Sequence, residues 1–340
     1  MMRYPENINN KSVIGFVAPS YSPSIEPYKS LFKNALKNLR ALGFKFDIGP
    51  NVYTAKGIGI SNKPDKCAKE LMDYYISDKN DCVISVGGGE LMCTILEYLD
   101  FNKIKESKAK WFMGFSDNTN FTFLLTTLCD VASIYGCNAP DFGMNGWHKS
   151  VEDSLDLLCG NIDTVYSYGM YEVDRSDIDD ICAPFNVSEK TRLYKYPKGD
   201  IYMKGRIIGG CLDCLINICG TRFDRVNEFI DQYHEDGFIW YLDSCDLNIM
   251  SNVRAMWQLK NAGWFRYVKG FIIGRPKACM YDKDVIDHRE AFMYMIRDLN
   301  VPVIIDADLG HINPSMPIIN GSIAEVKCKG NKMNIKMYKI

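Results

Sequence analysis

The chain has 340 residues and a formal net charge of −2, with 47% hydrophobic and 24% charged residues. This composition is ordinary for a globular protein with large buried cores. The charge balance lacks the basic excess expected of a protein that binds nucleic acid or an anionic membrane surface, so we expect neither partner. No apolar run approaches the ~20 residues that span a bilayer, and no signal-peptide pattern opens the chain. We therefore expect a cytoplasmic protein of about two domains.

The 13 cysteines predict no disulfide framework, because the count is odd and the chain carries no signal pattern. Cys82 and Cys129 lie in apolar runs, where cysteine packs as a small hydrophobe. The pair Cys211-x-x-Cys214 has no second pair to complete a zinc set, so we expect core thiols there. The four histidines show no metal-like spacing. We expect neither a metal ion nor an organic cofactor.

The first half of the chain alternates β-rich runs with helical patterns, which is typical of an open parallel sheet. We predict a doubly wound α/β domain over residues 1–165, with ligands at the carboxyl ends of the strands. The predicted strands are 12–18, 45–49, 82–86, 110–115 and 131–135, and the predicted helices are 27–42, 63–77, a segment from the glycine triplet to Leu99, and 118–129.

The second half is predicted to form a smaller mixed α/β domain over residues 200–340. Residues 166–199 are less periodic and rich in Asp, Tyr, Ser and Pro, and we interpret them as an interdomain crossover. The predicted strands are 200–208, 238–242, 270–273, 301–305, 318–324 and 332–337, and the predicted helices begin at Cys211 and cover 252–262 and 288–299.

A serine stands at a predicted strand-to-helix junction within KWFMGFSDNTNFTFLL, residues 110–125. Such a turn exposes the hydroxyl of Ser116, and the N–H of Asp117 points to where an oxyanion would form. This is the layout of a nucleophile elbow, although Asn118 replaces the usual second glycine. The alternative is an ordinary helix cap, in which Ser116 or Asp117 accepts hydrogen bonds from free N–H groups.

A glycine triplet, Gly87-Gly88-Gly89, follows the strand at 82–86 and reaches the same sheet edge as Ser116. It lacks the spacing of G-x-G-x-x-G and has no Lys-Ser/Thr, so both nucleotide motifs fail. One interpretation is a loop whose N–H groups supply an oxyanion hole. The other is a tight turn that needs positive φ.

A serine nucleophile needs a base, and that base needs an acid to fix its tautomer. His311 follows the predicted strand at 301–305, and Asp243 ends the apolar run FIWYL, with Asp246 three residues later. Either acid could pair with the imidazole, or serve as a helix cap. We expect the other three histidines, His148, His234 and His288, to be surface residues.

Seven segments in order resemble the L,D-carboxypeptidase / microcin-C-immunity family of serine peptidases. They are GFVAPS, VISVGGGELMCTILEYLDF, FMGFSDNT, IYGCNAPDFG, GRIIGGCLDCLINICGT, FIWYLDSCD and PVIIDADLGHINPSMPIINGSIAEV. The resemblance implies a flavodoxin-like N-terminal domain, a smaller C-terminal domain and a Ser-Glu-His triad. It also suggests a homodimer.

On this resemblance Ser116 is the nucleophile, His311 is the general base and acid, and Asp243 occupies the glutamate position. The N–H groups of Gly88 and Asp117 would form the oxyanion hole, and Gly87, Gly89 and Asp246 would contact the substrate. Two departures stand out. Aspartate is one methylene shorter than glutamate, which requires a shift of roughly 1 Å. The GGGE loop also lacks the arginine of the Arg-Gly-Gly-Tyr-Gly-like sequence found in many L,D-carboxypeptidases.

The resemblance implies a serine amidase that acts near a free carboxylate, on either a small muropeptide or an aminoacyl-nucleotide. Four aromatic residues could stack on a base, pack in the fold or contribute to a dimer interface: Phe142, Trp147, Tyr168 and Tyr171. Three other classes remain open: a binding protein that lost the reaction, a nucleotide-binding oxidoreductase and a structural protein.

Overall fold

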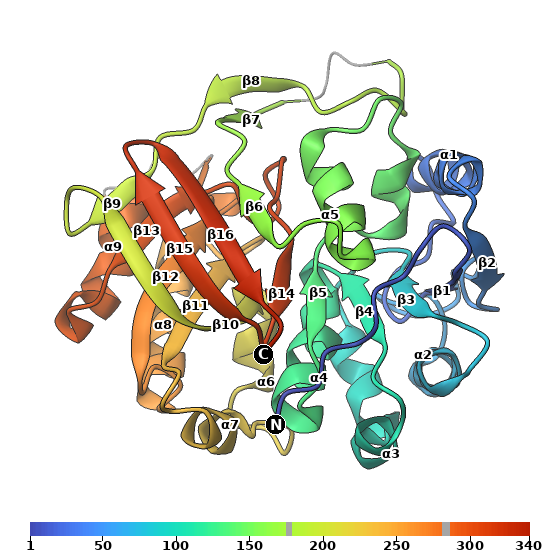
Figure 1. The fold of residues 1–340 in the computed structure, drawn as a ribbon, viewed down its shortest axis with the longest axis horizontal. Helices are drawn as coiled ribbons and strands as arrows, with labels where there is room; N and C mark the ends of the chain where they lie inside the picture. Colours follow the sequence, from blue (N-terminus) through green and yellow to red (C-terminus); the bar gives the residue numbers. More distant parts are fainter. Residues whose placement is uncertain (175–178, 281–285) are drawn as a thin grey trace. The chain divides into compact units, whose positions relative to one another are not determined.

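A computed structural model describes residues 1–174, 179–280 and 286–340 and divides into two compact units (Figure 1). The first unit comprises Met1–Ile162 and Asp174–Phe185, and the second comprises Asp163–Val173 and Asn186–Ile340. The segment 166–199, predicted as a crossover, is therefore divided between the two units, and its residues 175–178 lie outside the described residues.

Five parallel strands of the first unit pair in the order β2-β1-β3-β4-β5. This is the strand order of flavodoxin-like doubly wound sheets, and it confirms the predicted fold class. The strands are β1 (Val13–Val17), β2 (Lys45–Ile48), β3 (Cys82–Ser85), β4 (Trp111–Gly114) and β5 (Ser133–Tyr135). The α-helices are α1 (Tyr28–Ala41), α2 (Pro64–Ile76), α3 (Phe101–Glu106), α4 (Thr119–Cys129) and α5 (Lys149–Cys159).

The central strands β3 and β4 are apolar because both of their faces are covered, and every residue in them is buried. Helix α4 is also buried almost all round. Its Phe121 packs edge-on against Phe112 of β4, with ring centroids 4.8 Å apart, and against Tyr75 of α2. This packing fixes the strand-to-helix junction that carries Ser116.

The segment after the glycine triplet differs from its prediction. No α-helix starts there; instead a short 3-10 helix, η1 (Met92–Tyr98), begins after Leu91. The Met92 N–H donates to the Asp117 carboxylate at 2.9 Å, so a side chain from another turn satisfies the helix start. The start of this helix depends on a contact between residues that are far apart in the sequence, and local periodicity cannot predict such a contact.

The second unit contains an eight-stranded mixed sheet, which confirms the predicted mixed α/β domain. The strand order is β6-β16-β15-β10-β11-β12-β13-β9, with β10 to β13 parallel and antiparallel strands on both sides. A separate two-stranded ribbon pairs β7 with β8. The strands are β6 (Thr164–Tyr166), β7 (Met170–Glu172), β8 (Val187–Lys190), β9 (Tyr194–Tyr196), β10 (Ile201–Cys211), β11 (Phe238–Asp243), β12 (Val268–Gly274), β13 (Val303–Ala307), β15 (Ile323–Lys329) and β16 (Lys332–Tyr338).

Two glycine positions account for differences in the second unit. Gly209-Gly210 lies inside β10 instead of ending it. A Cβ on Gly209 would overlap the Tyr241 carbonyl of β11, so glycine is needed where the two strands approach closely. The strand predicted at 318–324 is split into β14 (Ile318–Asn320) and β15 at Gly321, which has φ 85°. The α-helices of this unit are α6 (Leu212–Ile218), α7 (Val226–Gln232), α8 (Ile249–Asn261) and α9 (His288–Ile296).

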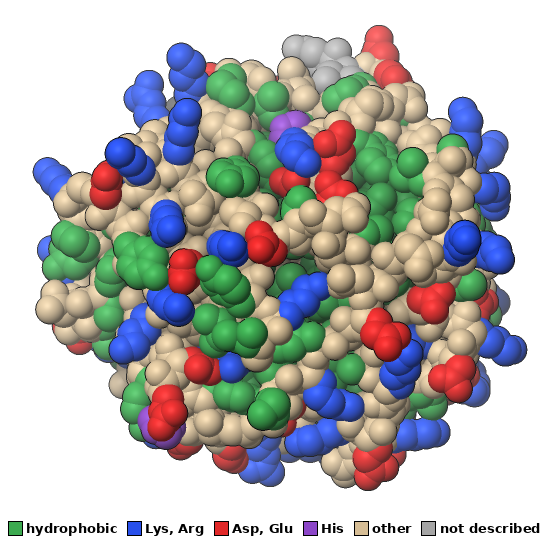
Figure 2. All heavy atoms as spheres, viewed as in Figure 1, with side chains coloured by type: hydrophobic (Ala, Val, Ile, Leu, Met, Phe, Trp, Pro, Cys, Tyr) green, Lys and Arg blue, Asp and Glu red, His purple; other side chains and the backbone are tan. Residues whose placement is uncertain are grey.

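The surface agrees with the near-neutral charge of the chain. Acidic and basic side chains are interspersed across the face drawn in Figure 2. No helix within the described ranges is long and apolar enough to cross a membrane.

Candidate active site

Candidate site residues occur in both units, and each group is described by itself. The serine half consists of Gly87, Gly88, Gly89, Ser116 and Asp117 of the first unit. The histidine half consists of Asp243, Gly310 and His311 of the second unit.

Ser116 lies on a strained turn directly after β4. Its φ is 64°, in the left-handed region that non-glycine residues rarely adopt. The 3-10 helix η2 (Ser116–Asn118) and then α4 begin there, and neither starts with a side-chain cap. The structure therefore does not support the interpretation of Ser116 or Asp117 as the cap of the helix that follows. The backbone at Ser116 instead has the conformation of a nucleophile elbow. Such a conformation costs about 1–3 kcal/mol and persists only where the surroundings impose it.

Hydrogen bonds from neighbouring strand ends impose this turn. The Ser116 N–H donates to the Tyr135 hydroxyl at 3.2 Å, and the Phe115 N–H donates to Asn138 Oδ1 at 3.3 Å. The Asn118 amide donates to the Gly87 carbonyl at 2.9 Å. The residue that replaces the second glycine of the elbow pattern thus joins the Ser116 turn to the glycine triplet.

The Asp117 carboxylate is a buried structural group. It accepts hydrogen bonds from Ser20 Oγ, from the Met92 N–H at 2.9 Å and from the Asn120 amide at 3.0 Å. Burial raises the pKa of this carboxyl, although the hydrogen bonds oppose the effect. The side chain therefore joins the loops after β1 and β3 to the start of α4. The part of Asp117 predicted for catalysis is its backbone N–H.

The glycine triplet is required for space and not for positive φ. None of the three residues has positive φ, so the tight-turn interpretation is wrong. A Cβ on Gly88 would lie 3.2 Å from both Cβ and Oγ of Ser116, and one on Gly87 would lie 2.8 Å from the Tyr21 carbonyl. A Cβ on Gly89 would overlap Ser20 Oγ. The loop thus lies directly against the serine, as the oxyanion interpretation requires.

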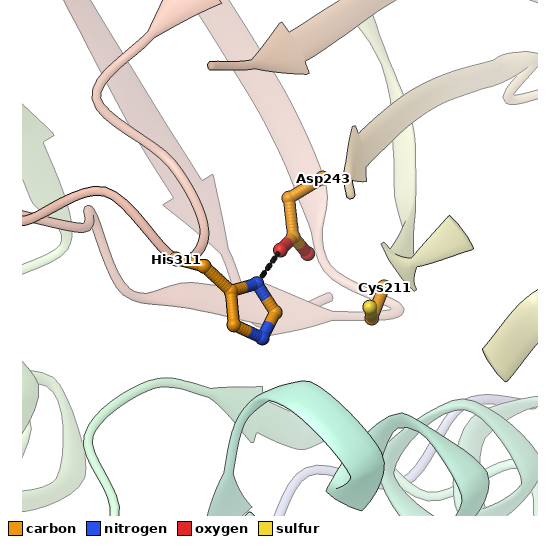
Figure 3. Close-up of side chains that lie close together, drawn as sticks. All are labelled: Cys211, Asp243 and His311. Atoms are coloured by element: carbon orange, nitrogen blue, oxygen red, sulfur yellow. Dashed lines mark hydrogen bonds and ion pairs between the residues drawn. The ribbon is translucent and has the colours of Figure 1, made fainter. Parts of the chain in front are cut away.

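In the histidine half, the imidazole pairs with Asp243 (Figure 3). His311 Nδ1 lies 2.6 Å from Asp243 Oδ2. The Asp243 side chain is fully buried, and that of His311 is 10% exposed. Asp246 is exposed, and its backbone N–H donates to Asp213 Oδ1 at 2.9 Å. The choice that the sequence left open therefore falls on Asp243.

A glycine permits this pairing. Gly310 has φ 94°, and a Cβ on it would lie 2.3 Å from the Asp243 Cβ. Its N–H donates to Ser315 Oγ at 2.8 Å, which fixes the loop that carries His311. Both the backbone conformation and the close approach exclude any other residue at this position.

The Asp243 carboxylate controls the charge of the imidazole. Burial alone would lower the pKa of His311, but the charge and hydrogen bond of Asp243, with a smaller contribution from Cys245, raise it to about 10. With Nδ1 bonded to Asp243, Nε2 is the nitrogen suited to exchange a proton with a hydroxyl. The pair therefore favours the protonated form of the imidazole.

Cys211 lies beside this pair, a placement that the sequence analysis missed. In the register of β10 and β11, Cys211 is opposite Asp243. Three potential metal-ligand atoms, one from each of Cys211, Asp243 and His311, all lie within 4.8 Å of one another. Zinc accepts these donor types, but binding it would compete with the His311–Asp243 hydrogen bond. Cys211 and Cys214 are buried, as expected, and no disulfide forms among the described residues.

One prediction about a side chain changes, and two open alternatives are narrowed. His288 is not a free surface residue, because its Nε2 lies 2.7 Å from Asp306 Oδ1. Phe142 is fully buried and cannot stack on a ligand in this conformation. Tyr171 covers the guanidinium of Arg275, with Cζ 4.5 Å from the ring centroid. His234 is exposed, as predicted.

Comparison with protein-family models gives two matches that together cover more than half of the chain. Residues 14–136 match the LD-carboxypeptidase N-terminal domain, and residues 204–326 match the LD-carboxypeptidase C-terminal domain. The chain belongs to the LD-carboxypeptidase family. Ser116 lies in the first matched segment, and Asp243 and His311 lie in the second.

Curated relatives of this LD-carboxypeptidase family member are distant but extend over most of its length. A Vibrio cholerae protein named "putative carboxypeptidase" is 24% identical over 93% of this chain and 92% of its own. A Rickettsia prowazekii protein with the same designation is 24% identical over 86% of this chain and 81% of its own.

Solved structures share the fold. An MccF-like protein from Bacillus anthracis is 21% identical, with a TM-score of 0.83 over 99% of this chain and 100% of its own. The microcin C7 self-immunity protein MccF, solved in complex with glutamyl sulfamoyl guanosine, is 21% identical, with a TM-score of 0.80 over 98% of each chain. An MccF-like protein from Streptococcus pneumoniae, solved with AMP, is 22% identical, with a TM-score of 0.78 over 96% of this chain and 98% of its own.

Proposed function

We propose that this protein is a serine hydrolase that cleaves an amide bond next to a free carboxylate, with Ser116, His311 and Asp243 as its catalytic triad. The observation that carries the proposal is the buried His311–Asp243 pair, with 2.6 Å between Nδ1 and Oδ2. A general base needs such a carboxylate to fix its tautomer and stabilise its cation. Membership of the LD-carboxypeptidase family supports the same chemistry.

In the proposed mechanism, the Ser116 hydroxyl transfers its proton to His311 Nε2 while its oxygen attacks the scissile carbonyl. This requires the two halves of the site to meet in the active protein. The N–H groups of Gly88 and Asp117 stabilise the oxyanion of the tetrahedral intermediate. The His311 imidazolium then gives its proton to the leaving amine, and water releases the acyl group by the same route in reverse.

The aspartate in place of glutamate is compatible with catalysis. Asp243 reaches His311 Nδ1 at normal hydrogen-bond length, so the missing methylene does not remove the contact. Aspartate is the third member of the triad in several unrelated hydrolases. This geometry weakens the alternative that the chain is a binding protein that has lost its reaction.

Two substrate classes fit the proposal, and we favour the aminoacyl-nucleotide. Solved structures of similar fold were obtained with glutamyl sulfamoyl guanosine, aspartyl sulfamoyl adenosine and AMP. The alternative is a muropeptide that loses a terminal D-alanine. The Gly87-Gly88-Gly89-Glu90 loop lacks the arginine expected of many L,D-carboxypeptidases, and this favours the nucleotide class.

The proposal is tested by comparing the wild type and Ser116→Ala on two substrates: a tetrapeptide muropeptide ending in D-alanine, and an aspartyl nucleotide joined through an amide. We expect the wild type to cleave the aspartyl nucleotide and Ser116→Ala to lose activity by a factor of ~10³ or more. Covalent labelling of the wild type, but not of Ser116→Ala, by a serine-directed phosphonate provides a second readout. Binding without cleavage by the wild type would contradict the proposal, and preference for the muropeptide would reverse the substrate assignment.

A further inference from the structure

Four of the eight residues that line a cavity in the second unit are Lys or Arg. Its volume is about 280 Å³, slightly below the ~300 Å³ at which sites for drug-sized ligands begin, so a small ligand would fit. Its walls come from the β7–β8 ribbon, the end of β12, the end of β13 and the start of α9. The lining residues are Tyr171, Glu189, Lys190, Arg192, Arg275, His288, Arg289 and Asp306.

Arg275 is buried in the wall of this cavity with part of its guanidinium unused. The residue is 2% exposed, and its Nη1 donates to Asp308 Oδ1 at 2.9 Å and to the Asp306 carbonyl at 3.0 Å. Its Nε and Nη2 donate to no atom among the described residues. These two nitrogens form the edge of the guanidinium that presents two parallel N–H groups, the arrangement that binds a carboxylate or phosphate in bidentate fashion.

The surroundings hold Arg275 in this orientation. The Asp308 carboxylate is fully buried and also accepts hydrogen bonds from Thr191 Oγ1 at 2.8 Å and from the Tyr168 N–H at 2.6 Å. The Tyr171 ring covers one face of the guanidinium. A buried donor edge held this rigidly is costly unless something accepts its hydrogen bonds.

The acidic side chains of the cavity do not pair with all of its cationic side chains. Asp306 is occupied, because its two oxygens lie 2.7 Å from His288 Nε2 and 2.6 Å from Arg289 Nε. Lys190 and Arg192 are exposed and form no ion pair with any residue that the structure describes. Glu189 is the remaining acid of the lining. Counting the buried Asp308 as well, four Lys and Arg side chains face three carboxylates.

We propose that Arg275, with Lys190 and Arg192, forms a binding site for the phosphate group of a small molecule. A carboxylate has two oxygens, and the Nε–Nη2 edge of Arg275 would occupy both. A phosphate group presents further oxygens to Lys190 and Arg192, which approach from a different chain segment. The site is distinct from the His311–Asp243 pair, and the proposal does not depend on the chemistry proposed for Ser116.

The test is isothermal titration of the full-length protein with inorganic phosphate, and with acetate at equal ionic strength. We expect saturable phosphate binding at one site per chain. Arg275→Lys keeps the charge opposite Asp308 but removes the bidentate edge, and it should weaken binding by about tenfold. The double variant Lys190→Ala/Arg192→Ala alters exposed residues, leaves the buried Arg275–Asp308 pair intact and should weaken binding by at least about tenfold.

The matched control is Lys198→Ala/Lys332→Ala, which removes two exposed cations of the same unit that do not line the cavity. It should bind phosphate within about twofold of the wild type. Three results would overturn the proposal: no saturable phosphate binding, equal weakening in the control variant, or acetate binding as tight as phosphate binding. If Arg275→Lys fails to fold, the Lys190→Ala/Arg192→Ala variant decides alone.

Discussion

The position of the Ser116 side chain is set by the backbone conformation, whereas that of the His311 side chain depends on a charged pair. The serine half combines one strained residue with glycines that have no room for a side chain, and hydrogen bonds among its loops hold it together. In the histidine half, one buried carboxylate raises the pKa of one buried imidazole. Changes of shape should therefore disturb the first half, and changes of charge should disturb the second.

Removing the charge from the histidine half should have the largest effect after loss of the nucleophile itself. Asp243→Asn keeps the shape of the side chain but no longer stabilises the imidazolium or its tautomer. We expect kcat to fall by ~10²–10⁴-fold with little change in KM. Glu235→Gln is the control: it alters an exposed acid of the same unit and should stay within about twofold of the wild type. Equal losses in both variants would contradict the pairing.

The pH dependence provides a second test of the charged pair. The base must be neutral to accept the serine proton, and Asp243 favours its protonated form. Activity should therefore rise with pH through neutrality, with a midpoint far above the ordinary 6.5 and toward about 10. In Asp243→Asn, burial and the smaller contribution of Cys245 remain, and the midpoint should fall far below that of the wild type, toward the ordinary 6.5. A wild-type midpoint near 6.5 would indicate that the carboxylate does not act on the base.

The same pKa shift affects folding stability in a defined direction. Because the pKa of His311 is higher in the folded protein than the unfolded value of 6.5, the pair stabilises the fold fully below pH 6.5. That contribution is lost as pH rises toward about 10. The free energies of unfolding of the wild type and Asp243→Asn, measured with denaturant at pH 6 and pH 9, test this. We expect the wild type to exceed the variant by more at pH 6 than at pH 9.

Gly310→Ala tests whether shape also matters in the histidine half. The new Cβ would collide with Asp243 at a backbone φ of 94°, so we expect a loss of about 2–4 kcal/mol in the free energy of unfolding. Gly330→Ala is the control, because Gly330 has φ 57° and no atom within 4 Å of the added Cβ. It should lose about 1 kcal/mol. Equal losses in the two variants would show that backbone strain alone, and not contact with Asp243, excludes other residues.

The smallest expected effect tests the serine half by shape alone. In Gly88→Ala the new Cβ would lie 3.2 Å from Ser116 Oγ, at a residue without positive φ. We expect kcat to fall about tenfold through displacement of the nucleophile, with the midpoint of the pH profile unchanged. A shift in that midpoint would show that the two halves are not separable in this way.

The sequence predicted the parts of the fold that depend on local pattern. The apolar runs that became β3, β4 and β11 are buried on both faces, and such runs bounded by Gly or Asp are recognisable without any partner. The choice between Asp243 and Asp246 was not predictable, because it depends on which side chain of a strand end and its following loop faces His311. Successive residues in these positions point in different directions.

Contacts between distant segments account for the remaining differences. The pairing of His288 with Asp306 joins the start of α9 to the end of β13, and neither local pattern encodes it. The same holds for Cys211, which reaches Asp243 through the register of two strands. For Gly87 to Gly89 the sequence left a choice between an oxyanion loop and a tight turn with positive φ. Only the backbone angles show that positive φ is absent, and only atomic positions show the lack of space for a side chain.

The left-handed backbone of Ser116 also limits which chemical replacements the chain can accept during evolution. Threonine carries the same hydroxyl, but its β-branched side chain is disfavoured at φ 64°. Glycine relieves the strain and abolishes the hydroxyl. A lineage that no longer needs the reaction would therefore gain stability by drifting to glycine at this position, whereas one that retains the reaction has no easy substitute for serine.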